Sequence, residues 1–355
     1  MSKRAKEGTP LSELVRLAKG VCQQAEQECP RTGPGRRPSI PDWAMAALIM
    51  VAVLKQRKTK AAQWRFIQQS WKQLQPFFPG VRPPSRSTYY ERFRRAYELF
   101  QKGVEIQGRQ MIDEGIIDAR VVAIDKSLIP SKGPVWHRRN RQKGDVPRGV
   151  DSDAHWGYGK HHGWVYGYSS EVVVSSGKAG VVAPILASVD PANKKEQVSI
   201  PPKLEALPSQ TKFILADAGY DSNKVAEKVE WTPQGRRSGQ RFLCQQQRRG
   251  KQRVPKQDWP RTKSRQRDRQ RREERQRYFK TPKARRIYAL RRQTIEPFFS
   301  WFKDRFDLHH QVHHRGLDNN RTHITAALCC YQLLIRYNFK CGNHNGEIQW
   351  ILDAL

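Results

Sequence analysis

Two aspartates each directly follow a short apolar run, a pattern that predicts acidic side chains at the ends of buried strands. Asp125 follows VVAI, and Asp217 follows FILA. If these strands are neighbours in one sheet, the carboxylates face each other across one strand spacing of about 4.8 Å. Such carboxylates repel unless a cation lies between them, and hard oxygen ligands favour Mg²⁺ or Mn²⁺. The pair therefore predicts a divalent metal site, although turns also accept aspartate freely.

A glutamate on a predicted helix is the third candidate ligand. The segment RRQTIEPFFSWFKDRF has helical character except at Pro297, which must kink the helix or lie near its first turn. Arg292, Glu296 and Lys303 are spaced by four and seven residues, so they share one helix face. Glu296 would complete the metal cage while the two cations hold phosphates. The alternative is an ordinary surface ladder of ion pairs.

Other side chains compete for these roles. Asp217 is preferred over Asp221, four residues further on, because four apolar residues precede Asp217 directly. The remaining rival carboxylates are Asp151, Asp153 and Asp304. Histidines at a spacing of four residues can bind zinc, and such pairs occur among His309, His310, His313 and His314. Because they lie between two arginines, contact with DNA or packing is favoured over zinc.

The overall charge of the chain points to a polyanionic partner. The 355 residues include 66 Lys and Arg against 33 Asp and Glu, a formal net charge of +33. Neutralising phosphates releases counterions, so we expect tight DNA binding that weakens steeply with salt. A ribosome-associated or chromatin-like protein is the alternative, but 10 Trp, 13 Phe and 11 Tyr indicate a packed core.

The sequence predicts a cytoplasmic protein without membrane contact. No apolar run reaches the roughly 18 residues of a membrane span, and the N-terminal MSKRAKEGTP lacks the apolar stretch of a signal peptide. The six cysteines are scattered and form no CxxC pair. They therefore indicate reduced thiols rather than a disulfide framework or a zinc finger.

The N-terminal third of the chain has the 3.6-residue periodicity of helices. Helices are predicted at about 42–56 and 60–74, and the capping-box spacing of Thr88 and Glu91 predicts a third that begins near residue 89. Three helices of which the last has a basic face suit a DNA reader of the helix-turn-helix type. The alternative is a solvated basic helix that only packs. The basic residues are Arg92, Arg94 and Arg95.

From about Arg120 the pattern changes to strands. Three successive strands are predicted at RVVAIDKSLIP, at the alternating and hence half-buried WVYGYSSEVVVSS, and at GVVAPILASVD. A helix broken by prolines precedes a fourth, KFILADAGYDS, and this order fits a mixed α/β sheet. Residues 236–286 then hold 21 Lys or Arg and 4 acidic residues, a local net charge of +17. That block predicts an insertion that faces nucleic acid.

The third candidate motif resembles that of the DDE transposases of bacterial insertion sequences, in the branch with a Y-x2-R-x3-E-x6-K signature. Arg292, Glu296 and Lys303 match its spacing residue for residue. Tyr288 lies one position too early, because Ala289 occupies the signature slot.

The first two motifs extend this resemblance over about residues 36–337. The run ADAGYDS around Asp217 is similar to the D-x-G-Y-D motif of the family, and HWGYGKHHGWVYGY is similar to the stretch that leads into its second strand. The first motif departs from the family, since Asp125-Lys126-Ser127 replaces Asp-Gly-Thr or Asp-Ser-Thr.

The resemblance implies an α/β fold, with a ribonuclease-H-like mixed sheet flanked by helices, an α-helical N-terminal domain and a basic insertion. Asp125, Asp217 and Glu296 would hold two Mg²⁺ or Mn²⁺ ions for in-line attack on a phosphodiester. Lys126 would contact phosphate, and Trp231 or Trp259 would stack on a flipped base. The implied parts are residues 1–115 (DNA-binding domain), 116–221 (first part of the core), 222–286 (insertion), 287–340 (catalytic and core helices) and 341–355 (tail).

The implied function is transposition at the nucleoid of a bacterial cell. The enzyme would cut at terminal inverted repeats and join 3′-OH ends to target DNA, as a homodimer in the DNA complex. One alternative is a decayed or domesticated copy that only binds DNA, which Lys126 and the displaced tyrosine favour. The other is a nuclease with the same core but no joining activity.

Overall fold

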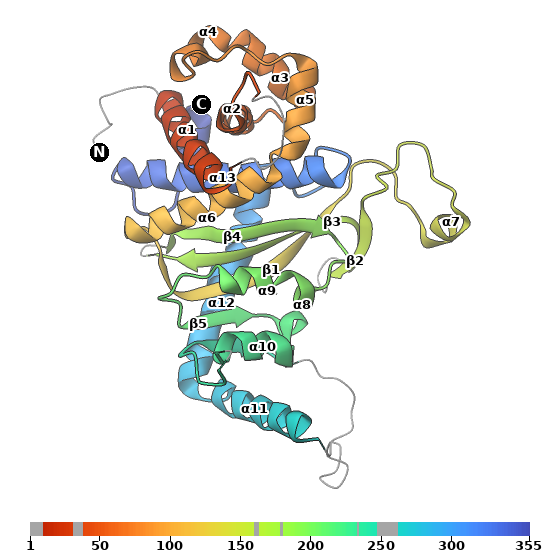
Figure 1. Ribbon diagram of the computed structural model, residues 1–355, viewed down its shortest axis with the longest axis vertical. Helices are drawn as coiled ribbons and strands as arrows, with labels where there is room; N and C mark the ends of the chain where they lie inside the picture. The colour runs from red at the N-terminus through yellow and green to blue at the C-terminus, as the bar shows by residue number, and fades with distance from the viewer. Residues whose placement is uncertain (1–9, 31–37, 160–162, 178–179, 233, 247–261) are drawn as a thin grey trace.

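The computed structural model describes residues 10–30, 38–159, 163–177, 180–232, 234–246 and 262–355. Helices of the N-terminal part lie above a mixed sheet in Figure 1, and two helices formed by residues 223–230 and 263–279 lie below it. The N-terminal helices are α1 (Pro10–Glu28), α2 (Asp42–Leu54), α3 (Lys60–Gln69), α4 (Trp71–Leu74), α5 (Arg86–Arg95) and α6 (Tyr97–Asp113), with a 3-10 turn, η1 (Gln75–Phe77).

The sheet and the remaining helices follow in the chain. The strands are β1 (Asp118–Pro130), β2 (His155–Gly159), β3 (Gly163–Ser176), β4 (Val182–Pro191), β5 (Phe213–Ala216) and β6 (Arg241–Cys244). The helices are α7 (Arg138–Lys143), α8 (Glu196–Ser199), α9 (Pro201–Glu205), α10 (Asn223–Glu230), α11 (Lys263–Phe279), α12 (Pro282–Arg305), α13 (Leu317–Lys340) and α14 (Gln349–Asp353), with a 3-10 turn, η3 (Ala218–Tyr220). The chain therefore has a mixed α/β fold.

The sheet combines antiparallel and parallel pairing. Strand β1 pairs antiparallel with β3 on one side and parallel with β5 on the other, and β6 extends the parallel side. Strand β3 also pairs antiparallel with β4 and, through residues 163–167, with β2. The first and fourth predicted strands are thus neighbours, the condition on which the predicted pair of carboxylates depends.

Both faces of strand β3 are covered, so the predicted half-buried strand is wrong. Residues 166–175 are all buried. Helix α12 crosses the sheet on one face, behind the strands in Figure 1, while α8 and α9 lie on the other. Glu171 of β3 accordingly points at Ser199 and Lys203 of those two helices.

Helix α13 joins the N-terminal helices to the sheet. Its residues from Thr322 to Asn338 are buried, as its apolar sequence predicts, and it packs against α1, α2, α6 and β4. Helix α2 is buried without interruption from Ala44 to Leu54. Each fully buried leucine or isoleucine there contributes about 1.5–3 kcal/mol. The N-terminal helices and the sheet therefore share one hydrophobic core.

Several predicted boundaries need correction. Helix α5 begins at Arg86 rather than near residue 89, because Ser85 is its N-cap and accepts from the Thr88 amide at 3.2 Å. The predicted second helix is interrupted at Ser70. Helix α12 runs through Pro297, which therefore does not lie in its first turn. The segment 341–355 contains α14, whose Ile351 is buried in the core.

The cysteines and the hydropathy of the helices complete the description of the fold. All six cysteines are free thiols. Within the part of the chain that the structure describes, no helix is both long and apolar enough to cross a bilayer.

Candidate active site

The pairing of β1 with β5 brings Asp125 and Asp217 side by side. Ile124 is in register with Ala216, so the two aspartates come next on adjacent parallel strands. The sequence predicts Asp125 at the end of its strand, and this prediction is wrong. Strand β1 continues past Asp125 to Pro130 because it pairs with β3 over that length. Only β5 ends here, which leaves the Asp125 carboxylate open to the site on that side.

The loop after β5 fixes the orientation of Asp217. Its Oδ1 accepts from the Gly219 amide at 2.8 Å, and a Cβ at Gly219 would lie only 3.0 Å from that oxygen. The Tyr220 hydroxyl donates to Glu171 Oε1 at 2.8 Å, and Glu171 also accepts from Ser199 at 2.9 Å and pairs with Lys203. The glycine and the tyrosine of the ADAGYD run thus have structural roles. The Gly219 amide orients Asp217, and the Tyr220 hydroxyl holds the loop against β3.

Glu296 reaches the same place from α12. A cavity of about 700 Å³ is lined by all three carboxylates, Asp125, Asp217 and Glu296. The Asp125 and Glu296 side chains are 18 % and 58 % exposed. Two carboxylates, one within β1 and one directly after β5, are thus complemented by an exposed glutamate on a helix, although Glu296 comes 79 positions after Asp217 in the chain.

The carboxylates influence one another. The pKa of Asp125 is raised from its ordinary value to about 7, first by burial and then by the negative charges of Asp217 and Glu296. The Arg291 guanidinium and the Lys126 amide, which donates to Asp125 Oδ1 at 2.8 Å, oppose that rise. A cation placed among the three carboxylates would relieve this repulsion.

Arg291 is a site residue that the sequence reasoning missed. Its guanidinium donates to Asp125 Oδ2, and its Nη1 lies 3.7 Å from Glu296 Oε1. Burial lowers the pKa of Arg291, but the neighbouring acidic groups, Asp125 first, raise it above the ordinary value overall. The only signal in the sequence was the doublet Arg291-Arg292. It could not show which of the two arginines faces the strands, because that depends on the rotation of the helix about its axis.

Three predicted cations line the cavity with different partners. Arg292 is exposed at its mouth. Lys303 is buried and donates to the Leu128 carbonyl at 2.9 Å, and burial lowers its pKa to about 8. Lys126 pairs with Glu196 at 2.8 Å and donates to the Lys194 carbonyl at 2.7 Å, so the departure from the family motif is accommodated without distortion of β1.

Tyr288 reaches the site although it lies one position before the signature slot. Its hydroxyl donates to the Ala216 carbonyl at 3.1 Å, directly before Asp217. Burial raises the pKa of this tyrosine to about 12, so the hydroxyl stays protonated as a donor near neutral pH. The register shift therefore leaves a tyrosine beside the carboxylates.

The donor set fits a hard divalent cation. Asp125, Asp217 and Glu296 supply only oxygen ligands, which Mg²⁺ and Mn²⁺ prefer. Within the described ranges, no group of three His, Cys, Asp or Glu side chains is close enough together to hold a metal ion. The Arg291 guanidinium lies between two of the three candidate ligands.

The sequence around these carboxylates matches a known protein family. The family model described as Transposase DDE domain matches residues 113–333, more than half of the chain. The chain belongs to this family. No curated protein and no solved structure matches it.

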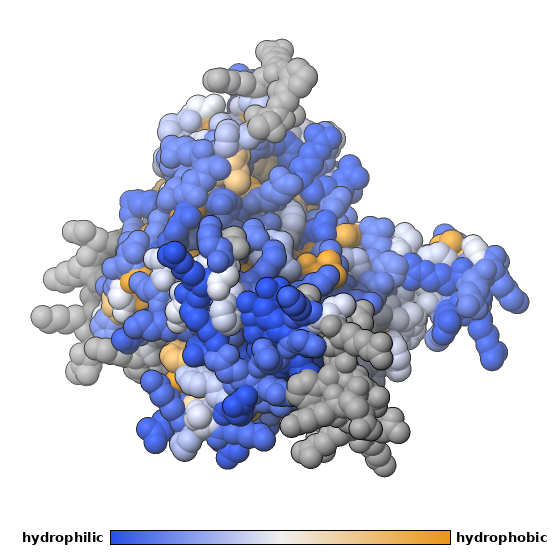
Figure 2. Space-filling view, turned by 60° about the horizontal axis from the view of Figure 1, so that its bottom comes forward, coloured by the Kyte–Doolittle hydropathy of each residue, from blue (hydrophilic) through white to orange (hydrophobic). Residues whose placement is uncertain are grey.

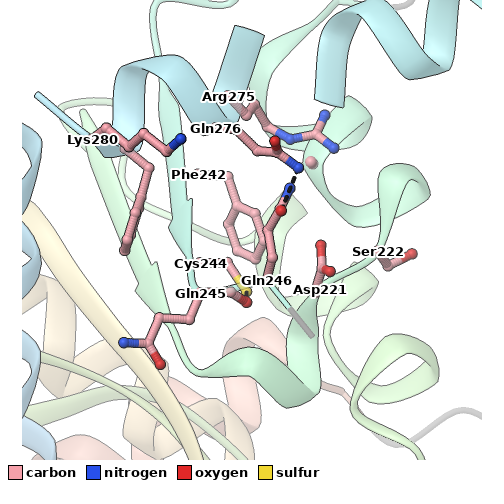
Figure 3. Close-up of a pocket in the computed structure, with 11 residues that line it drawn as sticks. Asp221, Ser222, Phe242, Cys244, Gln245, Gln246, Arg275, Gln276 and Lys280 are labelled. Carbon is pink, nitrogen blue, oxygen red and sulfur yellow. Dashed lines mark hydrogen bonds between the residues drawn. The ribbon is translucent and has the colours of Figure 1, made fainter. Parts of the chain in front are cut away.

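The rival carboxylates of this transposase-family chain have other partners. Asp221 pairs with Arg272 of α11 at 2.7 Å. It lines a separate cavity of about 420 Å³ together with Cys244 and Arg275 (Figure 3). Asp151 accepts from the Tyr168 hydroxyl at 2.7 Å.

The histidines after α12 separate into two groups. His309 pairs with Asp304 at 2.5 Å at the surface. His313 and His314 instead pack edge to face on His323, with ring centroids 5.1 and 4.9 Å apart. Burial lowers the pKa of His323 to about 3. Burial also lowers the pKa of His313 and His314, so the three packed rings are neutral at pH 7, with His314 and His323 buried and His313 half-buried.

The predicted DNA contacts are placed on several surfaces. Arg92 is half-buried and pairs with Asp42, whereas Arg94 and Arg95 are exposed on α5. Figure 2 shows a mostly hydrophilic face, from which the segment with the basic helix α7 projects at the right. Trp259 lies outside the described residues.

Aromatic side chains near these surfaces were only partly foreseen. The Trp231 ring has the guanidinium groups of Arg237 and Arg271 at 4.2 and 3.9 Å from its centroid, and it lines a basic groove along α11. Tyr158 and Trp164, which face each other across β2 and β3, are 64 % and 68 % exposed. Tyr158 also lines the carboxylate cavity, so this exposed pair lies at its edge.

Proposed function

We propose that the chain is a DNA transposase of the Y-x2-R-x3-E-x6-K branch that acts through two-metal phosphoryl transfer. It would cut at the terminal inverted repeats of an insertion sequence and join the 3′-OH ends to target DNA. The observation that carries this proposal is the single cavity lined by Asp125, Asp217 and Glu296, within a chain of the DDE transposase family. A ribonuclease-H-like core is supported by a carboxylate on the central strand of a sheet with one antiparallel and one parallel half.

Asp125, Asp217 and Glu296 would hold two Mg²⁺ or Mn²⁺ ions. When bound, such ions activate a water or a 3′-hydroxyl for in-line attack and stabilise the leaving oxygen. The chain itself orients the ligands: the Gly219 amide fixes Asp217, and the Lys126 amide fixes Asp125. Tyr288 holds the end of β5 by its bond to the Ala216 carbonyl.

Basic residues around the cavity would bind the DNA backbone. Arg292 at the mouth supplies a bidentate donor for a phosphate, and buried Lys303 adds positive charge to the wall. Exposed Arg94 and Arg95 would contribute to an N-terminal DNA-binding unit in residues 1–115, for which the helical fold and the charge are the support. The groove along α11 would guide DNA from the insertion, residues 222–286, toward the carboxylates.

The wider setting of the reaction is also a proposal. The enzyme would act in the bacterial cytoplasm, at the nucleoid, and as a homodimer in the DNA complex. The net charge of +33 supports association with DNA in that compartment.

A cleavage assay on DNA that carries the element ends tests the proposal. With Mn²⁺, the wild-type protein should nick the ends and join a pre-cut 3′-OH end to a target plasmid. Asp125→Asn, Asp217→Asn and Glu296→Gln should each abolish both steps and still shift the same DNA in a gel. Asp221→Asn is the matched control, because this carboxylate lies in the neighbouring cavity. DNA binding without cleavage by the wild type would favour a binding-only relative, and cleavage without joining would favour a nuclease.

A further inference from the structure

The guanidinium of Arg291 stands where a cation would be expected. It comes from α12, five residues before Glu296, and its contact with Asp125 crosses from the helix to the sheet. Residues five apart do not face each other squarely on a helix. Arg291 Nη1 nevertheless lies 3.7 Å from Glu296 Oε1, which makes this guanidinium a bridge between two carboxylates from different elements.

This bridge is buried but incompletely bonded. The Arg291 side chain is only 11 % exposed, and its Nε is a buried donor with no acceptor among the described residues. An unsatisfied buried donor costs about 1–3 kcal/mol. Arg291 therefore makes its two ion pairs but leaves one hydrogen bond unmade. This cost weakens the net contact of Arg291 with the carboxylates, so a competing cation can displace it more easily.

The carboxylates show the other side of this competition. Asp125, Asp217 and Glu296 line one cavity, yet among the described residues no three such side chains are gathered tightly enough for a metal. The Arg291 guanidinium contacts both Asp125 and Glu296, so it lies where an ion held by these two carboxylates would have to lie. Arg292, next in sequence, lines the cavity at its mouth and is exposed.

We propose that Arg291 is a tethered cation that occupies the metal position of the free enzyme and must leave when a divalent ion binds. The inference rests on the proposed function, since it takes the three carboxylates as the metal ligands. Arg291 would keep Asp125 and Glu296 together before loading, and it would lower the affinity for the ion by competing for the same oxygens.

Mn²⁺ titrations of the purified full chain without DNA test this idea. Electron paramagnetic resonance gives the signal of free Mn²⁺, so the bound fraction is measured independently of activity. Arg291→Gln keeps a polar side chain but removes the charge, and we expect it to bind Mn²⁺ about tenfold more tightly than the wild type, which corresponds to about 1.4 kcal/mol.

Arg292→Gln is the matched control. It removes the same charge from the same cavity without breaking the contact to Asp125, so its gain in Mn²⁺ affinity should be far smaller. Equal gains in the two variants, or no gain in Arg291→Gln, would overturn the inference. If Arg291→Gln does not fold, Arg291→Lys replaces it, because the shorter lysine lacks the planar fork of donors that contacts Asp125 and Glu296 together. An Mn²⁺ affinity of Arg291→Lys no higher than that of the wild type would then overturn the inference.

The same titration separates this inference from the proposed function. Asp125→Asn, Asp217→Asn and Glu296→Gln should each weaken Mn²⁺ binding. Wild-type affinity in all three variants would refute the metal site itself. Loss of binding in these variants together with no gain in Arg291→Gln would refute only the role of Arg291.

Discussion

Replacing Lys203 by methionine tests how the loop that carries Asp217 is held. Lys203 pairs with Glu171, and Tyr220 donates from the loop to the other oxygen of the same glutamate. The Lys203 and Glu171 side chains are 7 % and 3 % exposed. Without the ammonium group, the Glu171 carboxylate loses its cationic partner in a buried environment.

The expected loss of stability follows from this burial. Removing one partner of a buried ion pair costs about 3–5 kcal/mol, because the other charge stays uncompensated. Ser199 and Tyr220 continue to donate to Glu171, so we expect a value near the lower limit, about 3 kcal/mol. The double variant Glu171→Gln/Lys203→Met also removes the negative charge and should lose less than Lys203→Met alone.

Urea unfolding followed by circular dichroism measures these free energies. Lys228→Met is the control, because the ion pair of Lys228 with Glu205 is exposed and should contribute less than about 1 kcal/mol. A loss below about 1 kcal/mol for Lys203→Met would refute the reasoning. So would a double variant whose loss equals the sum of the two single losses, since the two side chains would then act independently.

Three further predictions concern pH and DNA. The pKa of His323 is lowered from 6.5 to about 3 by burial and then by His313, so its contribution to stability is present above pH 6.5 and is lost on acidification. We expect His323 to contribute about 2 kcal/mol to the loss of stability between pH 7 and pH 5 in urea titrations, so the loss in His323→Gln should be smaller than that of the wild type by about this amount. Arg94→Ala should weaken DNA binding and reduce the slope of log affinity against log salt by about 1. Arg92→Ala breaks the ion pair with Asp42 and should instead mainly lower the melting temperature, and the reverse pattern in the two variants would contradict these placements. Trp164→Ala should weaken binding of DNA with unpaired ends by about 1–3 kcal/mol and binding of duplex by less, and equal losses for both would argue against stacking.

The strands could be predicted from the sequence where their residues are apolar and short polar segments separate them. Strand β6 was missed because its four residues, RFLC, lie inside a block dominated by arginine, and only the pairing with β5 makes them a strand. The alternation in β3 suggested one exposed face. That face is covered by α8 and α9, whose polar residues Ser199 and Lys203 satisfy Glu171, and no local pattern reveals such a long-range partner.

The three carboxylates that line the candidate cavity could be proposed from the sequence, but the side chains that contact them could not. Asp125 and Asp217 could be proposed because each follows an apolar run, and parallel pairing then makes them neighbours. The choice between Arg291 and Arg292 as partner of Asp125 depends on the rotation of α12 over the sheet. The spacing of residues along α12 shows which side chains are neighbours on that helix. It does not show which of them contacts β1.

Diffraction from crystals soaked in Mn²⁺, recorded to give the anomalous signal of manganese, tests the central claim most directly. The account predicts a peak bonded to oxygens of Asp125 and Asp217 at about 2.1 Å, with Glu296 turned toward it and Arg291 displaced from Asp125. Manganese bound elsewhere while the Asp125–Arg291 contact persists would contradict it.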